Sequence, residues 1–288
     1  MSKPKIAEQL KELESIEGSY PEEKGNLKLY KELLEILEPL EKASNLGTRS
    51  PIDWEAISET AKRSLKERRH LGTYLDPSIF DAELIRETVL KLIGYLVAEN
   101  PSTKPLVGVS EALIEGSLRI EDGIRALLKE DASWFQEKAQ THRLDPSLLL
   151  SLFELPLRPF FEEAARRFEK TFIEDWWEQT CPVCGRSPPV GRMKSKKLYL
   201  ICQYCGTGYT VDLFQCFSCG NKDPTKLGFA APKGRPDLEL NYCELCKNYI
   251  KVINEDRLQQ KIPSGLEDLL TRELDELAKV PDLNLSRI

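Results

Sequence analysis

Eight cysteines are the residues of this chain whose type and spacing indicate chemistry. They form four C-x-x-C pairs within residues 181–246, namely Cys181/Cys184, Cys202/Cys205, Cys216/Cys219 and Cys243/Cys246. Two residues between cysteines allow a tight turn that directs both sulfurs at one point, and four thiolates complete a tetrahedral shell around zinc or iron. Since no cysteine is left over, the sequence predicts two metal ions, each bound by four cysteines. It does not distinguish iron from zinc.

The residues around these pairs favour metal binding over other cysteine chemistry. Glycine, which accepts a left-handed backbone, follows three of the pairs as Gly185, Gly206 and Gly220, and Lys247 follows the fourth. A disulfide framework suits an oxidising compartment, but the first residues, MSKPKIAEQL, contain no apolar stretch of a secretory signal. A thioredoxin-type dithiol would be one pair rather than four in series. We therefore expect reduced thiols and a cytoplasmic protein.

The spacing of the pairs favours sequential over interleaved pairing. Seventeen residues separate Cys184 from Cys202 and 23 separate Cys219 from Cys243, whereas only ten, residues 206–215, lie between the two halves. Each half is too small for a useful hydrophobic core, so metal is expected to supply much of its folding free energy. The expected ligand sets are Cys181, Cys184, Cys202 and Cys205 at one ion, and Cys216, Cys219, Cys243 and Cys246 at the other. Interleaved pairing, as in cross-brace zinc modules, is the alternative.

The expected sites point away from catalysis. A metal ion with four cysteine ligands has no open coordination position and cannot act as a hydrolytic Lewis acid. Zinc would make the sites structural, whereas iron would allow one-electron transfer or redox sensing. The sequence contains no P-loop, dinucleotide-binding, nucleophile-elbow or H-E-x-x-H motif. We interpret His70 and His142, which are distant from the cysteines in sequence, as surface or helix-end residues. No enzymatic activity, catalytic residue or organic cofactor is predicted.

Charge is distributed unevenly along the chain. The net charge is −6, but residues 181–251 carry 11 Lys/Arg and 5 Asp/Glu, so the rest is strongly acidic. Eight thiolates and two divalent ions would leave the metal region only mildly basic, which disfavours nucleic-acid binding. No apolar run is long enough to span a membrane. A basic loop, Arg192, Lys194, Lys196 and Lys197, either balances the thiolate charge, which we favour, or meets an acidic partner.

Hydrophobic periodicity predicts an α+β protein with an all-helical N-terminal domain. Helical patterns occupy residues 27–43, 80–98, 106–129, 133–142 and 160–177, and another helix follows Ser50-Pro51. Pro39 is expected to kink or end the first of these. Strands at 197–201 and 209–214 would form a hairpin around the second C-x-x-C pair. The expected division is residues 1–179 for the helical domain, 180–214 and 215–254 for two tandem four-cysteine modules, and 255–288 for a C-terminal helix.

The C-terminal segment carries its own helix signal. Ser264-Gly265-Leu266-Glu267 reads as a capping box, and an apolar stripe follows it, formed by Leu266, Leu269, Leu270, Leu274 and Leu277. Each leucine is worth roughly 1.5–3 kcal/mol when buried. We therefore expect residues 264–279 to dock on the helical domain.

The ordered set of motifs resembles the FdhE family of formate dehydrogenase accessory proteins. The matching text is Cys181-Pro-Val-Cys184-Gly185, Leu198-Tyr-Leu-Ile-Cys202-Gln-Tyr-Cys205-Gly206-Thr207, Cys216-Phe-Ser-Cys219-Gly220-Asn221 and Cys243-Glu-Leu-Cys246-Lys247-Asn248-Tyr249-Ile250-Lys251. Leu157-Arg158-Pro159-Phe160-Phe161-Glu162 and Leu283-Asn284-Leu285 also resemble the family. A departure is Gly208-Tyr209, which stands where an acidic residue and tryptophan are expected; it affects packing more than ligation.

This resemblance implies a helical domain joined to two rubredoxin-like or zinc-ribbon modules. It also implies a cytoplasmic factor that binds the molybdopterin-containing catalytic subunit of formate dehydrogenase during maturation. Two other functions stay open on the residues alone: a rubredoxin-type electron carrier or redox sensor, and a zinc-ribbon nucleic-acid binder.

Overall fold

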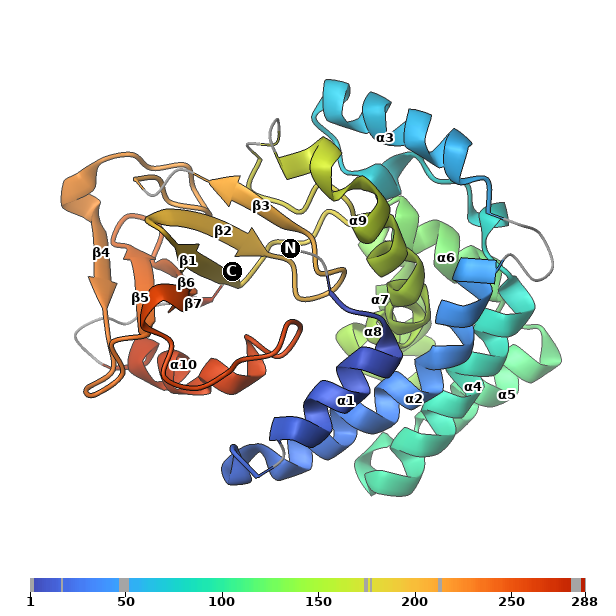
Figure 1. The fold of residues 1–288 in the computed structure, drawn as a ribbon. Helices are drawn as coiled ribbons and strands as arrows, with labels where there is room; N and C mark the ends of the chain where they lie inside the picture. Colours follow the sequence, from blue (N-terminus) through green and yellow to red (C-terminus); the bar gives the residue numbers. More distant parts are fainter. Residues whose placement is uncertain are drawn as a thin grey trace.

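The computed structural model describes residues 3–16, 18–46, 52–173, 176, 178–211, 214–280 and 286–287. Figure 1 shows two parts side by side, a helical part that contains α1 to α9 and a β-sheet with the short helix α10 beneath it. The α+β class predicted from the sequence is confirmed, with the helical part preceding both four-cysteine modules.

Aspartate caps explain where several helices begin. Asp53, Asp81 and Asp145 each accept hydrogen bonds from backbone N–H groups of the first turn, which would otherwise have no partner. The helices are α1 (Ile6–Ile16), α2 (Lys24–Leu46), α3 (Trp54–Glu67), α4 (Ala82–Glu99), α5 (Leu106–Glu115), α6 (Ile120–Leu128), α7 (Ala132–His142), α8 (Pro146–Glu154), α9 (Arg158–Ile173) and α10 (Arg272–Ala278). Short 3-10 helices are η1 (Pro21–Glu23), η2 (Leu71–Tyr74), η3 (Pro77–Ile79), η4 (Pro101–Thr103), η5 (Leu155–Leu157), η6 (Pro224–Lys226), η7 (Glu255–Arg257) and η8 (Leu269–Thr271).

Two features of the first helices differ from the sequence prediction. Of the two effects predicted for Pro39, a kink or an end of the helix, the end is wrong, because α2 continues through Pro39 to Leu46. The turn beyond Pro39 is held from outside, because the Glu41 carboxylate accepts the Ile6 N–H and pairs with Arg166. Helix α1 was not predicted either; its apolar residues are few, but Ile6 is fully packed into the core.

The sheet contains seven strands in the described residues, and Figure 1 shows how they lie. They are β1 (Val190–Lys194), β2 (Lys197–Ile201), β3 (Gly208–Val211), β4 (Leu227–Ala230), β5 (Leu238–Cys243), β6 (Asn248–Asn254) and β7 (Ser286–Arg287). The order is β3-β2-β1-β6-β5-β4, and β7 pairs with the start of β6. The predicted hairpin of β2 and β3 is present, although residues 212–213 of the predicted second strand lie outside the described residues.

The sheet is built from two tandem repeats. In each repeat three strands follow one another in antiparallel fashion, β1-β2-β3 in the first and β4-β5-β6 in the second. The repeats join where β1 pairs in parallel with β6, with Val190 opposite Lys251 and Arg192 opposite Ile253. The two four-cysteine modules therefore share one continuous sheet.

The C-terminal segment lies between this sheet and the first two helices. Leu266, Leu270 and Leu274 are buried in the main core, and α10 packs on β5. Contacts to the helical part are made by Arg272, which pairs with Glu23 of η1. The helix begins later than the capping box predicts, at Arg272. Glu267 instead forms a buried ion pair with Arg192 of β1 and accepts the Gly265 N–H.

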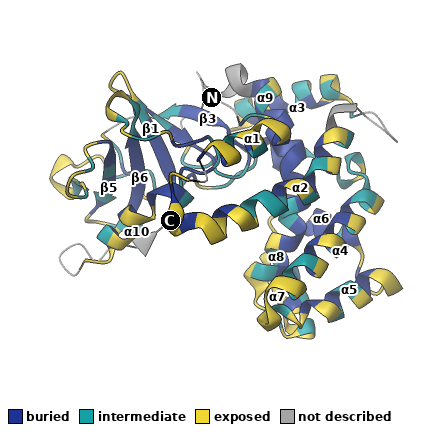
Figure 2. Ribbon diagram, turned by 60° about the horizontal axis from the view of Figure 1, so that its bottom comes forward, coloured by how far each residue is buried: buried dark blue, intermediate teal, exposed yellow. Residues whose placement is uncertain are grey.

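Burial divides into one large core and one small one. The large core joins the helical part to one face of the sheet, and the small one, around Trp176, covers part of the other face. Figure 2 shows β6, in the interior of the sheet, almost entirely buried. Within the described residues, every helix is too short or too polar to cross a bilayer.

Candidate metal centres

The eight cysteines come together in two groups of four. Cys181, Cys184, Cys202 and Cys205 form the first group, and Cys216, Cys219, Cys243 and Cys246 form the second, with the sulfurs of each group within 4.8 Å of one another. All eight are free cysteines. The sequential grouping predicted from the spacing is the one found, and each group is positioned to bind a metal ion.

One backbone arrangement positions all four pairs. We call the C-x-x-C turn and the residue after it a knuckle, and number residues 181–185, 202–206, 216–220 and 243–247 as knuckles 1 to 4. In each, the N–H of the last residue donates to the carbonyl of the first cysteine over 2.8–3.0 Å. In knuckles 1 to 3 the first cysteine's N–H also bonds the residue that follows the turn. The turn is thus set by local hydrogen bonds rather than by tertiary contacts.

Each knuckle ends in a left-handed residue, as predicted for the three glycines and not for Lys247. Gly185, Gly206 and Gly220 have φ between 72 and 79°, and Lys247 has φ 62°. At Gly206 a side chain is excluded for a second reason, since a Cβ there would lie 2.4 Å from Lys3. The same holds at Gly185, where a Cβ would lie 2.6 Å from the His70 ring.

The geometry of the sulfurs fits a tetrahedral ion. A metal with bonds of about 2.3 Å to four thiolates places its sulfurs about 3.8 Å apart. The Sγ–Sγ distances are Cys184–Cys202 3.4 Å, Cys181–Cys205 3.5 Å, Cys216–Cys246 3.6 Å and Cys219–Cys243 3.9 Å. These values lie well beyond the about 2.05 Å of a disulfide. Four soft sulfur donors without a carboxylate or imidazole suit zinc or iron.

Polar groups near the sulfurs fit thiolates. The Thr207 hydroxyl lies 3.1 Å from Cys205 Sγ in the first group. In the second group Ser218 N–H and the Asn221 amide lie 3.4 Å and 3.6 Å from Cys216 Sγ and Cys243 Sγ. Such donors stabilise metal-bound thiolates.

Each group combines thiols of raised and of lowered pKa. In the first group hydrogen bonds from Cys181 and Cys184 lower the pKa of Cys202, and in the second group burial raises the pKa of Cys216 to about 12. Burial raises the pKa of the Cys181 and Cys184 thiols. Burial also acts on Cys243, but backbone N–H groups of Cys246 and Leu245 outweigh it and lower the pKa to about 7. A thiolate formed at a buried cysteine of either group therefore depends on a compensating cation.

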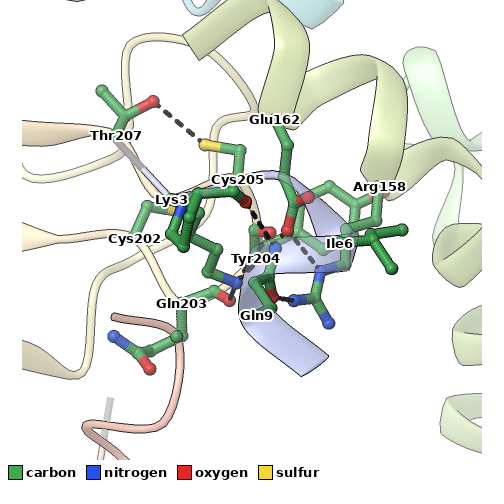
Figure 3. Close-up of polar contacts among 12 residues, drawn as sticks. Lys3, Ile6, Gln9, Arg158, Glu162, Cys202, Gln203, Tyr204, Cys205 and Thr207 are labelled. Carbon is green, nitrogen blue, oxygen red and sulfur yellow. Dashed lines mark hydrogen bonds and ion pairs between the residues drawn. The ribbon is translucent and has the colours of Figure 1, made fainter. Parts of the chain in front are cut away.

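A buried lysine ties the first group to the helical part (Figure 3). Lys3 is 1% exposed, and its Nζ donates to the carbonyls of Gln203 and Tyr204 in knuckle 2, the latter over 3.3 Å. It also lies 3.5 Å from Glu162 of α9, which pairs with Arg158. The Lys3 ammonium group thus links knuckle 2 to α9, with backbone carbonyls on one side and the Glu162 carboxylate on the other.

Knuckle 1 is held from the other side by His70 and Arg186. The His70 ring lies against Gly185, and its Nε2 is 2.7 Å from Glu130. Arg186 stacks on Tyr204, with 3.5 Å from its guanidinium carbon to the ring centroid, and pairs with Glu154. The interpretation of His70 as a helix-end residue is confirmed, because His70 is the N-cap of η2. It belongs to neither cysteine group, and its ring lies between Gly72 of η2 and Gly185 of knuckle 1.

The second group lacks such cover in the described part of the chain. Cys219 is exposed, whereas no cysteine of the first group is. Leu245 in knuckle 4 is 67% exposed, and Phe214 and Phe229 nearby are 73% and 75% exposed.

The residues of the predicted basic loop have different environments in the structure. Arg192 is 6% exposed and pairs with Glu267 and Glu255 of the C-terminal segment, so it neither balances thiolates nor meets a partner. Lys194 also reaches Glu255, over 3.5 Å. Lys3, His70 and Thr207 were not identified from sequence; only Thr207, next to a knuckle, had a position that could have indicated a role.

Comparison with known proteins connects this arrangement to FdhE. No protein-family profile matches the chain. Protein FdhE homolog of Aquifex aeolicus (strain VF5) is 29% identical over 107 residues, which is 35% of this chain and 38% of the relative. The chain is therefore aligned with well under half of that relative's length. The crystal structure of the FdhE protein from Pseudomonas aeruginosa superimposes with a TM-score of 0.59 at 19% identity, over 99% of this chain and 94% of that one. The chain thus has the fold of FdhE, and its predicted resemblance to the FdhE family is confirmed.

Proposed function

We propose that this protein is an accessory factor of formate dehydrogenase that binds the molybdopterin-containing catalytic subunit in the cytoplasm and performs no turnover itself. The observation that carries the proposal is the match of nearly the whole chain to the FdhE fold, together with the FdhE-named relative. The role in formate dehydrogenase maturation is what the resemblance to the FdhE family implies.

The cysteine groups support a binding role rather than a catalytic one. Four protein ligands would close the coordination shell of each ion and leave no position for a substrate. We propose that all eight cysteines are metal ligands. The metal then acts through folding, since it holds together repeats whose strands are short.

The test combines binding and activity. The tagged full chain, purified with its metal, should retain the catalytic subunit of the formate dehydrogenase encoded in the same genome. A strain that lacks the gene should lose formate dehydrogenase activity, and the gene in trans should restore it. Full activity in that strain, with no detectable complex, would contradict the proposal.

The exposure of Cys219 favours one second candidate, electron transfer at the second group. An exposed ligand brings an iron centre close to a redox partner. This candidate requires iron at that site and a reversible change in visible absorption on reduction. Zinc at both sites, measured by elemental analysis of protein from its own organism, would exclude it.

A further inference from the structure

One face of the sheet is covered over the first repeat and over β6, whose Ile250 and Val252 belong to the same cluster, and is open over β5 and β4 of the second repeat. Trp176, 1% exposed, packs in one cluster with Leu198, Leu200 and Tyr209 of the first repeat. Its indole N–H donates to the Thr180 carbonyl over 2.7 Å. Across β5 and β4 of the second repeat this face instead forms a cavity of about 320 Å³.

The repeats show what has changed at equivalent positions. Asn241 precedes Cys243 by the same two residues by which Leu200 precedes Cys202, and Glu239 is likewise equivalent to Leu198. Leu198 and Leu200 are buried under Trp176. The second repeat therefore has a carboxylate and an amide where the first has an apolar floor.

Two side chains of β5, Glu239 and Asn241, present oxygen acceptors to the cavity, which is also lined by Gln215, Ser218, Tyr242 and Asn248. Asn241 Oδ1 is buried and has no hydrogen-bond donor among the described residues. Burial raises the pKa of the Glu239 carboxyl, opposed by the charge of Arg257 and by a hydrogen bond from Asn241. Glu239 is the only Asp or Glu that lines the cavity, and no Lys or Arg among the described residues does so. Cys216 and Cys243 also line the cavity. Four thiolates around a divalent ion carry a net negative charge, so a loaded second group would add to the negative potential of Glu239.

Aromatic side chains surround these acceptors. Phe214, Phe217 and Phe229 line the cavity. Phe214 and Phe229 are more exposed than any other large apolar side chain in the described part of the chain. Exposed aromatic groups around a concave site are typical of protein-binding surfaces.

We propose that this cavity is the docking site for an arginine side chain of the partner protein, whose guanidinium group donates to Glu239 and Asn241 Oδ1 beside the Phe229 ring. The inference deepens the proposed function and rests on it for the partner's identity, the catalytic subunit. Arginine fits better than lysine because its planar fork supplies several donors at once and stacks on aromatic faces. A purely apolar side chain would leave Asn241 Oδ1 without a partner.

The chemistry can be tested without the partner. The probe is N-acetyl-arginine amide at millimolar concentration, and its control is the neutral, similarly shaped N-acetyl-citrulline amide. NMR spectra of the metal-loaded full chain should show shifts at Asn241, Phe229 and Ile250 with the arginine probe only. Glu239→Gln should weaken binding roughly ten-fold, and Asn241→Leu, which restores the residue type of the first repeat, should reduce it similarly. Equal shifts with both probes, or none with either, would overturn the proposal.

A pull-down with the catalytic subunit separates this inference from the proposed function. Glu239→Gln and Phe229→Ala should each reduce retention of the subunit about ten-fold. Matched controls are Glu244→Gln, on knuckle 4, and Ile114→Ala, an exposed apolar residue of α5. Metal content and melting temperature of every variant verify folding.

The outcomes are distinct. If wild type and both cavity variants retain the subunit equally, the docking site is wrong and the proposed function stands. If wild type does not retain the subunit but binds the arginine probe selectively, the proposed function fails and the cavity serves another protein.

Discussion

Knuckles 1 and 2 of the first cysteine group sit against the helical part, whereas knuckles 3 and 4 of the second group lie at the outer end of the sheet. The hydrogen bond that closes each knuckle, to the carbonyl of its first cysteine, is the same in both groups. Their surroundings differ, because His70 and Lys3 press on the first group and Cys219 of the second is exposed. The knuckle is therefore a property of local sequence, and burial is added by elements remote from it.

Removal of cysteine ligands should give the largest difference in stability between the two groups. Cys181→Ser/Cys184→Ser should destabilise the whole chain, because Cys181 belongs to the core shared with the helices. A structural metal site contributes about 10–16 kcal/mol, comparable with a total stability of about 5–15 kcal/mol. Cys243→Ser/Cys246→Ser should lose about half of the metal and leave the first group and the helices folded. Metal content and thermal melting by circular dichroism measure both effects. Equal loss of helical signal in the two variants would contradict the difference.

Glycine substitutions should give the next largest difference. Alanine in the left-handed region costs about 1 kcal/mol at any knuckle. Gly206→Ala and Gly185→Ala should lose about 1–3 kcal/mol more, because Lys3 or His70 must move. Gly220→Ala serves as the control, since the nearest side chain, Gln179, is 3.5 Å from its Cβ position. Chemical denaturation of the metal-loaded protein measures all three, and equal losses would show that the helical part does not press on the first group.

Removal of the buried ammonium group should have a smaller effect, confined to the first group. Lys3→Met leaves the Gln203 and Tyr204 carbonyls without their donor and Glu162 with one cation fewer. We expect a loss of about 1–3 kcal/mol, with faster metal release from the first group to a chelator. Lys11→Met, at an exposed position of α1, is the control. Unchanged stability and release rates would mean that Lys3 does not support knuckle 2.

The smallest effect is expected at Lys247. Lys247→Gly removes the strain of φ 62° but gives the unfolded chain more freedom. These terms oppose each other, so the net change should stay within about 0.5 kcal/mol. Denaturant melts can resolve a larger change, which would indicate that the lysine side chain contributes to the second group.

The sequence predicts the knuckles and their grouping, but few of the contacts between distant segments. The left-handed glycines followed from the sequence because each knuckle closes on itself, and the grouping of the eight cysteines followed from the short linker, residues 206–215, between the two halves. The pairing of β1 with β6 did not, since it joins segments about sixty residues apart. The continuation of α2 through Pro39 and the burial of Lys3 depend on partners far along the chain, for which no local pattern exists. The division at residues 179, 214 and 254 stays a prediction, and the closing motif at 283–285 lies outside the described residues.

Because β1 pairs in parallel with β6, the repeats are stacked head to tail, and a contact of this kind does not close on itself. The first strands of the two repeats, β1 and β4, are equivalent, and so are the third strands, β3 and β6. The outer edge of β4 is therefore equivalent to the edge of β1 that pairs with β6. A β3 strand from another molecule would therefore suit the β4 edge and start a filament. Helix α9 packs against β3 and hinders its use as that donor, while β4 offers only four residues. The helical part thus lies against one of the two strands that such a head-to-tail contact would use.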